Sequence, residues 1–240
     1  MPDEFDQTAL LCDPFYQPVA PLGRDSKGRP IVRPGQLIWA HQVYPPKDPY
    51  IVHVQGYDLR DDSKTSYVIR KLDPQRPPGT HFPIKELELR ADENYYILLG
   101  KKRPAVVVQT VSSIWLNKLY PEPYVWVAPA FSFKPRHEAE FRYRVAAMEF
   151  PHLFYLPAQV YGLSEPSVLR FEFIQPVALA GVQPLFTSDG KQSALSETAW
   201  AILLHQLVKF ATGKPLDEGL EETLQAYQSL VLEEYRKGQA

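Results

Sequence analysis

Proline limits what this chain can fold into more than any other residue. The 240 residues include 24 prolines, about twice the usual share of ~5%. Because proline has no N–H group and clashes with the preceding helical turn, it ends helices, and in sheets it is confined to edges, first positions and bulges. We therefore expect a mainly β fold made of many short strands and loops.

A buried strand is predicted after the basic residues Lys101, Lys102 and Arg103. Pro104 opens this strand, and residues 105–108 are an unbroken apolar run with three successive valines. β-Branched side chains in a row predict a buried strand. Arg103 is then held at the entrance of a rigid element, which suits a phosphate-binding or transition-state-stabilising arginine. The alternative is a solvated strand end, since charged residues are mostly exposed.

Other apolar runs between turn residues predict further strands. Residues 50–57 and 66–70, separated by a polar turn, indicate a β-hairpin. Residues 1–33 are rich in proline and polar turn residues, and we expect an N-terminal extension that acts as a linker or tail. Its local basic charge leaves an arm for nucleic acid or a partner as the alternative. The remaining predicted strands are residues 36–41, 95–99, 124–128, 153–156, 167–173 and 177–179.

Two helices are expected at the C-terminal end. Ser196 is a suitable N-cap for the first helix, and Gly213 stands where a C-cap glycine is expected. The second helix is predicted to start near Pro215. Both have apolar residues at helical spacing, which predicts packing on the sheet or a partner surface. These residues are Ala199, Ile202, Leu203, Leu207 and Phe210 in the first helix, and Leu216, Leu220, Leu224, Tyr227 and Val231 in the second.

Length and charge set the broad class of the protein. We expect residues 34–213 to form one domain with an insertion at about 45–95, followed by a C-terminal helix within 214–240. The net charge of −2 excludes a globally basic nucleic-acid binder, so any such site is a local patch. The single cysteine, Cys12, allows no intrachain disulfide and favours a reducing, cytoplasmic location. No apolar run approaches the ~20 residues that span a membrane.

The densest basic cluster lies between residues 131 and 144. Basic side chains alternate there with aromatic ones, which suits single-stranded RNA because phosphates need positive charge and bases can stack on rings. The alternative is an exposed hairpin whose aromatic residues point inward. The cluster contains Lys134, Arg136, His137, Arg142 and Arg144, together with Phe131, Phe133, Phe141 and Tyr143.

Several kinds of chemistry have no motif in this sequence. It contains no phosphate-binding glycine loop and no Gly-x-Ser-x-Gly elbow. The six histidines are scattered, and with one cysteine they form no recognisable zinc site. We therefore expect neither a cofactor nor a metal.

Four segments, in this order, resemble the PemK/MazF family of toxin ribonucleases. Residues 34–39 look like the family's opening strand, and residues 102–109 are similar to its Arg-Pro strand, which is the most specific match. Residues 162–170, with 173–177 close behind, look like a late strand. Residues 195–197 open a helix like the terminal helix of the family.

This resemblance implies an SH3-like, partly open β-barrel, often dimeric, that cleaves single-stranded RNA without a metal and is neutralised by a cognate antitoxin. In such a reaction the 2′-OH attacks the adjacent phosphorus, and charge develops on the phosphorane. Arg103 matches the arginine of the family, and Ser132 stands for the hydroxyl residue that follows the next strand. Lys101, Lys102, Lys134, Arg136, Arg142 and Arg144 are then candidates for binding the RNA backbone.

The chain also departs from the pattern of the family. About sixty residues separate its first strand from the Arg-Pro strand, and the loop motif that covers the RNA groove in the family is not recognisable. The alternative function is therefore a non-catalytic barrel that binds RNA or inhibits a protein target, as gyrase-inhibiting relatives do. A third possibility is a scaffold whose hairpin and helices bind a protein partner.

Overall fold

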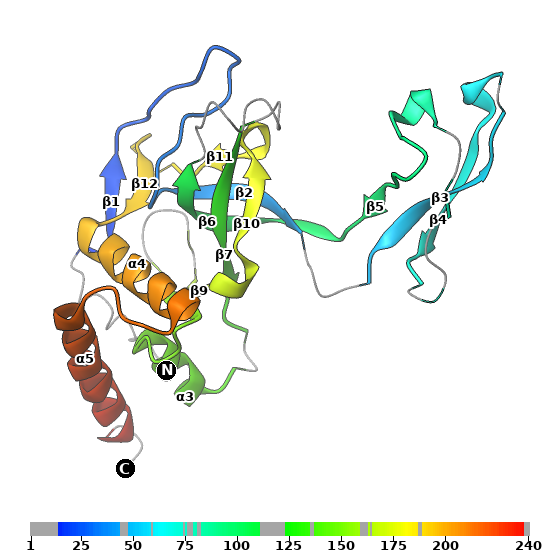
Figure 1. The fold of residues 1–240 in the computed structure, drawn as a ribbon. Helices are drawn as coiled ribbons and strands as arrows, with labels where there is room; N and C mark the ends of the chain where they lie inside the picture. Colours follow the sequence, from blue (N-terminus) through cyan, green and yellow to red (C-terminus); the bar gives the residue numbers. More distant parts are fainter. Residues whose placement is uncertain are drawn as a thin grey trace. The chain divides into compact units, whose positions relative to one another are not determined.

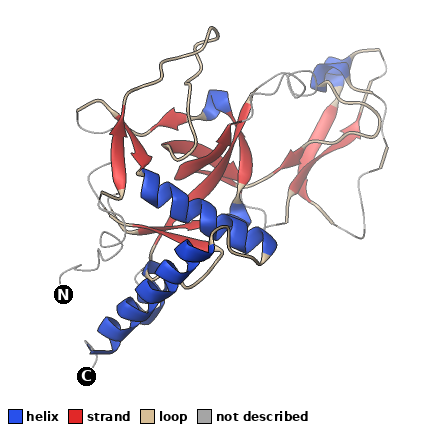
Figure 2. Ribbon diagram, turned by 60° about the vertical axis from the view of Figure 1, so that its left-hand side comes forward, coloured by secondary structure: helices blue, strands red, loops and turns tan. Residues whose placement is uncertain are grey.

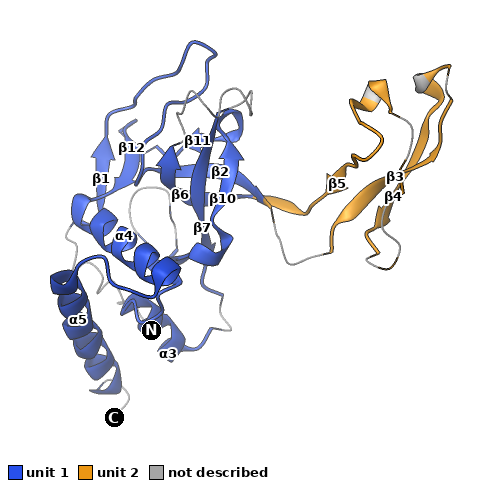
Figure 3. Ribbon diagram, viewed as in Figure 1, with its two compact units in different colours: residues 1–42, 102–240 blue, residues 43–101 orange. Residues whose placement is uncertain are grey.

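The computed structural model describes residues 14–43, 48–58, 60–73, 75, 79–80, 83–110, 123–134, 137–158, 163, 165–186 and 189–237. The chain divides into two compact units (Figure 3). Unit 1 contains residues 1–42 and 102–240, and unit 2 contains residues 43–101.

An antiparallel sheet of seven strands is the centre of unit 1 (Figure 1). The strand order is β11-β2-β6-β7-β9-β8, and β10 also pairs with β7. Among the described residues this sheet ends at β11 and β8 and does not close into a barrel. The strands are β2 (Leu37–Val43), β6 (Gly100–Thr110), β7 (Tyr124–Ser132), β8 (Leu153–Leu156), β9 (Ser167–Arg170), β10 (Gln175–Ala178) and β11 (Gln183–Pro184).

The fold is thus mainly β, as the proline content predicts. The valine run of β6 is buried on both faces of the sheet. Val106 lies in the cluster that α4 covers, whereas Val107 lies in a second cluster with Ile38 and Val127 on the opposite face. A β-bulge falls between Val107 and Gln109 in the pairing with β7.

A second, two-stranded sheet pairs two strands of unit 1 that are far apart in the sequence. Strand β1 (Tyr16–Val19) pairs antiparallel with β12 (Gln192–Leu195). Phe15 and Tyr16 are buried in the main core cluster. Part of the expected N-terminal extension is therefore a core element, which the sequence analysis did not predict.

The two C-terminal helices are confirmed as α4 (Glu197–Thr212) and α5 (Glu218–Lys237). The Ser196 side chain accepts a hydrogen bond from the Ala199 N–H group, and Gly213 ends α4 at φ 71°. Both predicted caps are therefore present. In Figures 1 and 2, α4 lies along the sheet of unit 1 and α5 runs toward the C-terminus. The inner side of α4 supplies Ala199, Ile202 and Leu203 to the core.

Two segments differ from the expected structure. The basic segment after β7 contains a helix, α3 (Ala139–Ala146), where the alternative interpretation expected a hairpin. Residues 171–173, expected to continue a strand, form the 3-10 helix η3 (Phe171–Phe173). The strand predicted at residues 177–179 corresponds to β10, and only its last residue, Leu179, belongs to the following 3-10 helix η4 (Leu179–Gly181).

Unit 2 contains a three-stranded antiparallel sheet in the order β4-β3-β5 (Figure 3). The strands are β3 (Tyr50–Gly56), β4 (Ser66–Lys71) and β5 (Tyr96–Ile97). β3 and β4 form the predicted hairpin, with a register shift between Val54 and Gly56. Two 3-10 helices, η1 (Asp62–Lys64) and η2 (Lys85–Leu87), complete the unit.

In the part of the chain that the structure describes, no helix combines the length and apolar character needed to cross a membrane.

Candidate functional site

Arg103 lies on β6 at the edge of the buried part of this strand. Ala105 pairs with Pro129 on β7, so the same antiparallel register brings Arg103 opposite Phe131. The guanidinium carbon Cζ lies 4.7 Å from the centroid of the Phe131 ring. Burial lowers the pKa of Arg103 from its ordinary value, but an arginine stays protonated at neutral pH. Arg103 therefore offers a fixed, partly desolvated positive charge.

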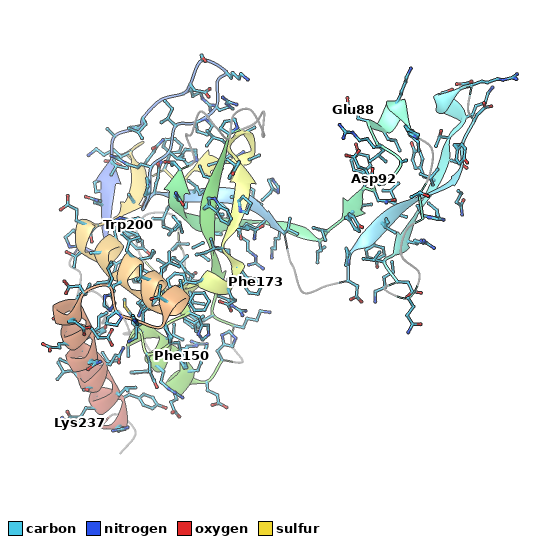
Figure 4. All side chains as sticks on the ribbon, viewed as in Figure 1. Glu88, Asp92, Phe150, Phe173, Trp200 and Lys237 are labelled. Carbon is cyan, nitrogen blue, oxygen red and sulfur yellow. The ribbon has the colours of Figure 1, made fainter. Side chains whose placement is uncertain are left out.

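A second arginine approaches the same ring from β9. The Cζ atom of Arg170 lies 5.6 Å from the centroid of Phe131 and 4.4 Å from that of Phe173. The two rings are themselves 5.6 Å apart, and Figure 4 marks Phe173 in η3. We call these four residues, Arg103, Phe131, Arg170 and Phe173, the Arg–Phe cluster.

An acidic side chain restrains one of the two arginines. Glu172 forms a salt bridge with Arg170, in which Nε of Arg170 lies 2.7 Å from Oε1 of Glu172. Cation–π contacts at partly exposed sites contribute roughly 0.5–1 kcal/mol each. The ion pair and the ring contacts together hold the Arg170 side chain over the cluster.

Ser132 does not share the face of the cluster. It is the last residue of β7 and pairs with Ser167, whereas Phe131 pairs with Val168. Successive strand residues point to opposite faces, so Ser132 lies on the side of Ala130 and away from Phe131 and Arg103. The register thus places an aromatic ring, and not the expected hydroxyl, opposite Arg103.

The two lysines before Arg103 lie at the exposed start of β6. Lys102 donates a hydrogen bond from Nζ to Oε1 of Gln183 on β11, at 2.6 Å. Its Nζ also lies 6.0 Å from the Trp39 ring of β2. Lys101 is exposed. Lys102 therefore has a defined position on the sheet, and its ammonium group has further N–H donors besides the one that Gln183 accepts.

Most of the predicted basic segment serves the packing of α3. Arg144 binds Glu149 through two hydrogen bonds of 2.6 and 2.8 Å, and this partner lowers the pKa of Glu149. Arg142 donates from Nη2 to the carbonyl oxygen of Lys134 at 3.1 Å. Lys134 is exposed, and Arg136 lies outside the described residues. Arg144 is thus largely neutralised, whereas Arg142 and Lys134 lie near the end of β7.

The aromatic residues of this segment contact one another. Phe133 lies 5.9 Å from His137 and 6.4 Å from Phe141, measured between ring centroids. Phe141 also lies 5.8 Å from Phe150, which Figure 4 labels beside α3. These phenylalanines and Phe131 are half-buried against one cluster that includes Val168. The packing contacts of these phenylalanines therefore attach α3 to the sheet.

Together these contacts form a row of half-buried rings along the end of β7. Arg103 and Arg170 contact this row at Phe131. Lys134 and Arg142 lie at the other end of the row, near Phe133. Such a row can accept a single-stranded nucleic acid, because the arginines bind phosphates and the exposed ring surface stacks with bases. Sequence reasoning found Arg103 and the aromatic residues separately. It missed Arg170 and Phe173 as members of the site, although both lie within segments that resemble the family.

A second group of charged residues lies between α4 and α5. His205 is fully buried, and its Nε2 atom is 2.8 Å from Oε2 of Glu221. Lys209 donates from Nζ to Oε1 of Glu221 at 2.5 Å, and Gln225 donates to the same oxygen. Burial alone would raise the pKa of Glu221, but hydrogen bonds from Lys209, His205 and Gln225 outweigh it and lower the pKa to about 2. We call His205, Lys209 and Glu221 the interhelix cluster.

The interhelix cluster lines a small pocket with Gln206 and Gln228, both of which donate to the carbonyl oxygen of Met148. These bonds attach α4 and α5 to the turn after α3. No group of three or more His, Cys, Asp or Glu residues in the described ranges is arranged to hold a metal ion.

Comparison with protein-family models and with curated protein sequences gave no match to this chain.

Proposed function

We propose that this chain is a metal-independent endoribonuclease that cleaves single-stranded RNA at the Arg–Phe cluster. The observation that carries the proposal is the position of Arg103: a half-buried guanidinium on a rigid strand, 4.7 Å from the Phe131 ring centroid. The motif resemblance to PemK/MazF toxins supports the same reaction. In this proposal the seven-stranded sheet is an open variant of the SH3-like barrel, and a cognate antitoxin neutralises the protein.

The reaction begins when the 2′-OH of a ribose attacks the adjacent phosphorus. The 2′ oxygen gives its proton to solvent as the new O–P bond closes a cyclic phosphate. The bond to the 5′ oxygen of the next nucleotide breaks, and that oxygen takes one proton from solvent and leaves as a free 5′-OH, so no net proton is gained or lost. Negative charge develops on the phosphorane between these two events. Arg103 stabilises this charge, and its partial desolvation strengthens the interaction relative to water.

The other residues of the cluster bind and orient the strand. Arg170, whose charge Glu172 largely offsets through Nε and Nη2, holds the rings of Phe131 and Phe173 in place, and these rings stack with bases. Lys102 and Arg142 contact the backbone on either side. Arg144 acts on the structure of α3, because Glu149 occupies its donors.

An RNA cleavage assay in a metal chelator tests this proposal. Wild-type protein is expected to cut a long single-stranded RNA into products that end in a cyclic phosphate. Arg103→Ala is expected to lose activity by about 100-fold or more, the usual effect of removing one transition-state donor. Arg236→Ala, an exposed arginine in the last turn of α5, is the matched control and keeps full activity. Folded wild-type protein that leaves RNA intact would refute the proposal.

A second candidate function is RNA binding without cleavage. It is favoured by the β7 register, which turns Ser132 away from Arg103 and leaves no hydroxyl of β7 opposite the guanidinium. Fluorescence anisotropy with a labelled single-stranded RNA separates the two functions. Binding that weakens in Arg170→Ala, in a protein that shows no cleavage, would establish this second candidate.

A further inference from the structure

The sheet of unit 2 exposes its more apolar face. The pairing register places Tyr50, Val52 and Val54 of β3 on the same face as their cross-strand partners. Those partners are Tyr67, Ile69 and Lys71 on β4 and Ile97 on β5. We call these seven residues the apolar face. Six of the seven are Tyr, Val or Ile.

Exposure of this face is high for such side chains. Tyr50 is 50% exposed, Tyr67 51%, Ile69 59% and Ile97 39%. The opposite face carries Ile51, His53, Val68, Arg70 and Tyr96, and there Ile51 is fully buried. A contiguous exposed apolar patch of this kind marks an interaction site.

The charge balance of unit 2 restricts which kind of molecule can cover the apolar face. Its only charged residue, Lys71, forms an ion pair with Asp48 at 2.6 Å between Nζ and Oδ2. Residues 43–101 contain nine basic residues (five Lys and four Arg) and nine acidic ones (six Asp and three Glu). A nucleic acid needs a net positive surface, and a strongly charged protein needs one of the opposite sign. A neutral apolar face is instead complementary to another copy of itself.

We propose that the apolar face binds the same face of a second copy of this chain. The two three-stranded sheets then pack face to face about a two-fold axis, as sheets do in a sandwich with a spacing of about 10 Å. Tyr67 and Ile69 lie near the centre of the contact, and the Lys71–Asp48 pair lies at its rim. This inference uses unit 2 alone and does not depend on ribonuclease activity.

Light scattering after size exclusion, over a range of protein concentrations, tests the proposal. Wild-type protein is expected to approach twice the 27.5 kDa mass of one chain. Ile69→Glu introduces two buried, unpaired carboxylates into the dimer and is expected to weaken it by about 100-fold or more. The matched control is Val68→Glu, one residue along the same strand but on the opposite face, and it is expected to remain dimeric.

Three results would overturn the inference. A wild-type chain that stays monomeric at every concentration shows that something other than a second copy covers the face. If Ile69→Glu and Val68→Glu weaken the dimer equally, the two chains pair through the edges of their β4 strands and not through the apolar face. A dimer that neither substitution affects is built on another surface. Circular dichroism spectra that match wild type show that both variants are folded, because both positions are exposed in the single chain.

Discussion

Among the described residues, Glu221 has the most strongly shifted pKa. Its carboxylate accepts hydrogen bonds from residues of both C-terminal helices, and its pKa falls to about 2 from an ordinary 4.5. A group with a lowered folded-state pKa contributes stability that is complete above its unfolded pKa. That contribution is lost as the pH falls from about 4.5 toward 2.

We predict that Glu221→Gln destabilises the protein by about 2 kcal/mol or more at pH 7, because it leaves Lys209 and His205 without a carboxylate in a buried site. Urea unfolding of wild type and variant, measured from pH 7 down to pH 2.5, checks this prediction. The difference in unfolding free energy should be constant above pH 5 and shrink below it. A difference that does not change with pH would contradict the role given to Glu221.

The site residues were only partly predictable, for a physical reason. Pro104 and the valines that follow it determine where Arg103 lies on its strand, so local sequence was sufficient to predict that position. Arg103 and Arg170 both reach the Phe131 ring through pairing between three strands, β6, β7 and β9, that are not all consecutive in sequence. The register of β7 also decides that Phe131, and not Ser132, lies opposite Arg103, and a one-residue difference in register reverses the face.

At the scale of elements, the prediction succeeded where local signals were strong. Both caps of α4, the hairpin of unit 2 and the buried strand β6 follow from side-chain spacing and turn residues. Helix α3 was missed because its short sequence mixes charged and aromatic residues, and its aromatic side chains contact rings outside the helix, among them Phe133, Phe150 and, on α5, Tyr235. Strands β1 and β12 were missed because each is short and is held by the other.

The N-cap of α4 gives a prediction at the same scale. Ser196 accepts a hydrogen bond from the Ala199 N–H group at 3.2 Å. Ser196→Ala is expected to lower the unfolding free energy by about 1 kcal/mol, whereas Ser196→Asp retains a capping acceptor and is expected to stay near wild type. Thermal or urea unfolding of wild type and the two variants checks the order of their unfolding free energies. Equal loss in both variants would mean that packing of the serine, and not capping, stabilises this helix end.

At the scale of the whole molecule, the two units differ in how much apolar surface they bury. Unit 1 contains four clusters of buried residues. Among the described residues of unit 2, the buried hydrophobic side chains are Ile51, Ile84 and Leu89. Few buried contacts mean a low free energy of local opening.

Hydrogen exchange followed by mass spectrometry should therefore distinguish the units. At low protein concentration, amides of β3 and β4 are expected to exchange at least about 10-fold faster than those of residues 105–108 in β6. At high concentration the exchange of β3 and β4 should slow if the apolar face is covered by a second chain. Equal protection of both units in the dilute protein would contradict this division.

The pairing of β1 with β12 has a consequence for synthesis of the chain. Residues 16–19 are synthesised long before their partners, residues 192–195. At a synthesis rate of about 5–20 residues per second, roughly 10–35 seconds pass between the synthesis of β1, with the neighbouring Phe15, and the synthesis of β12, which covers them. During this interval the nascent chain exposes Phe15 and Tyr16, which are buried in the finished fold, and unit 1 cannot close before β12 is made.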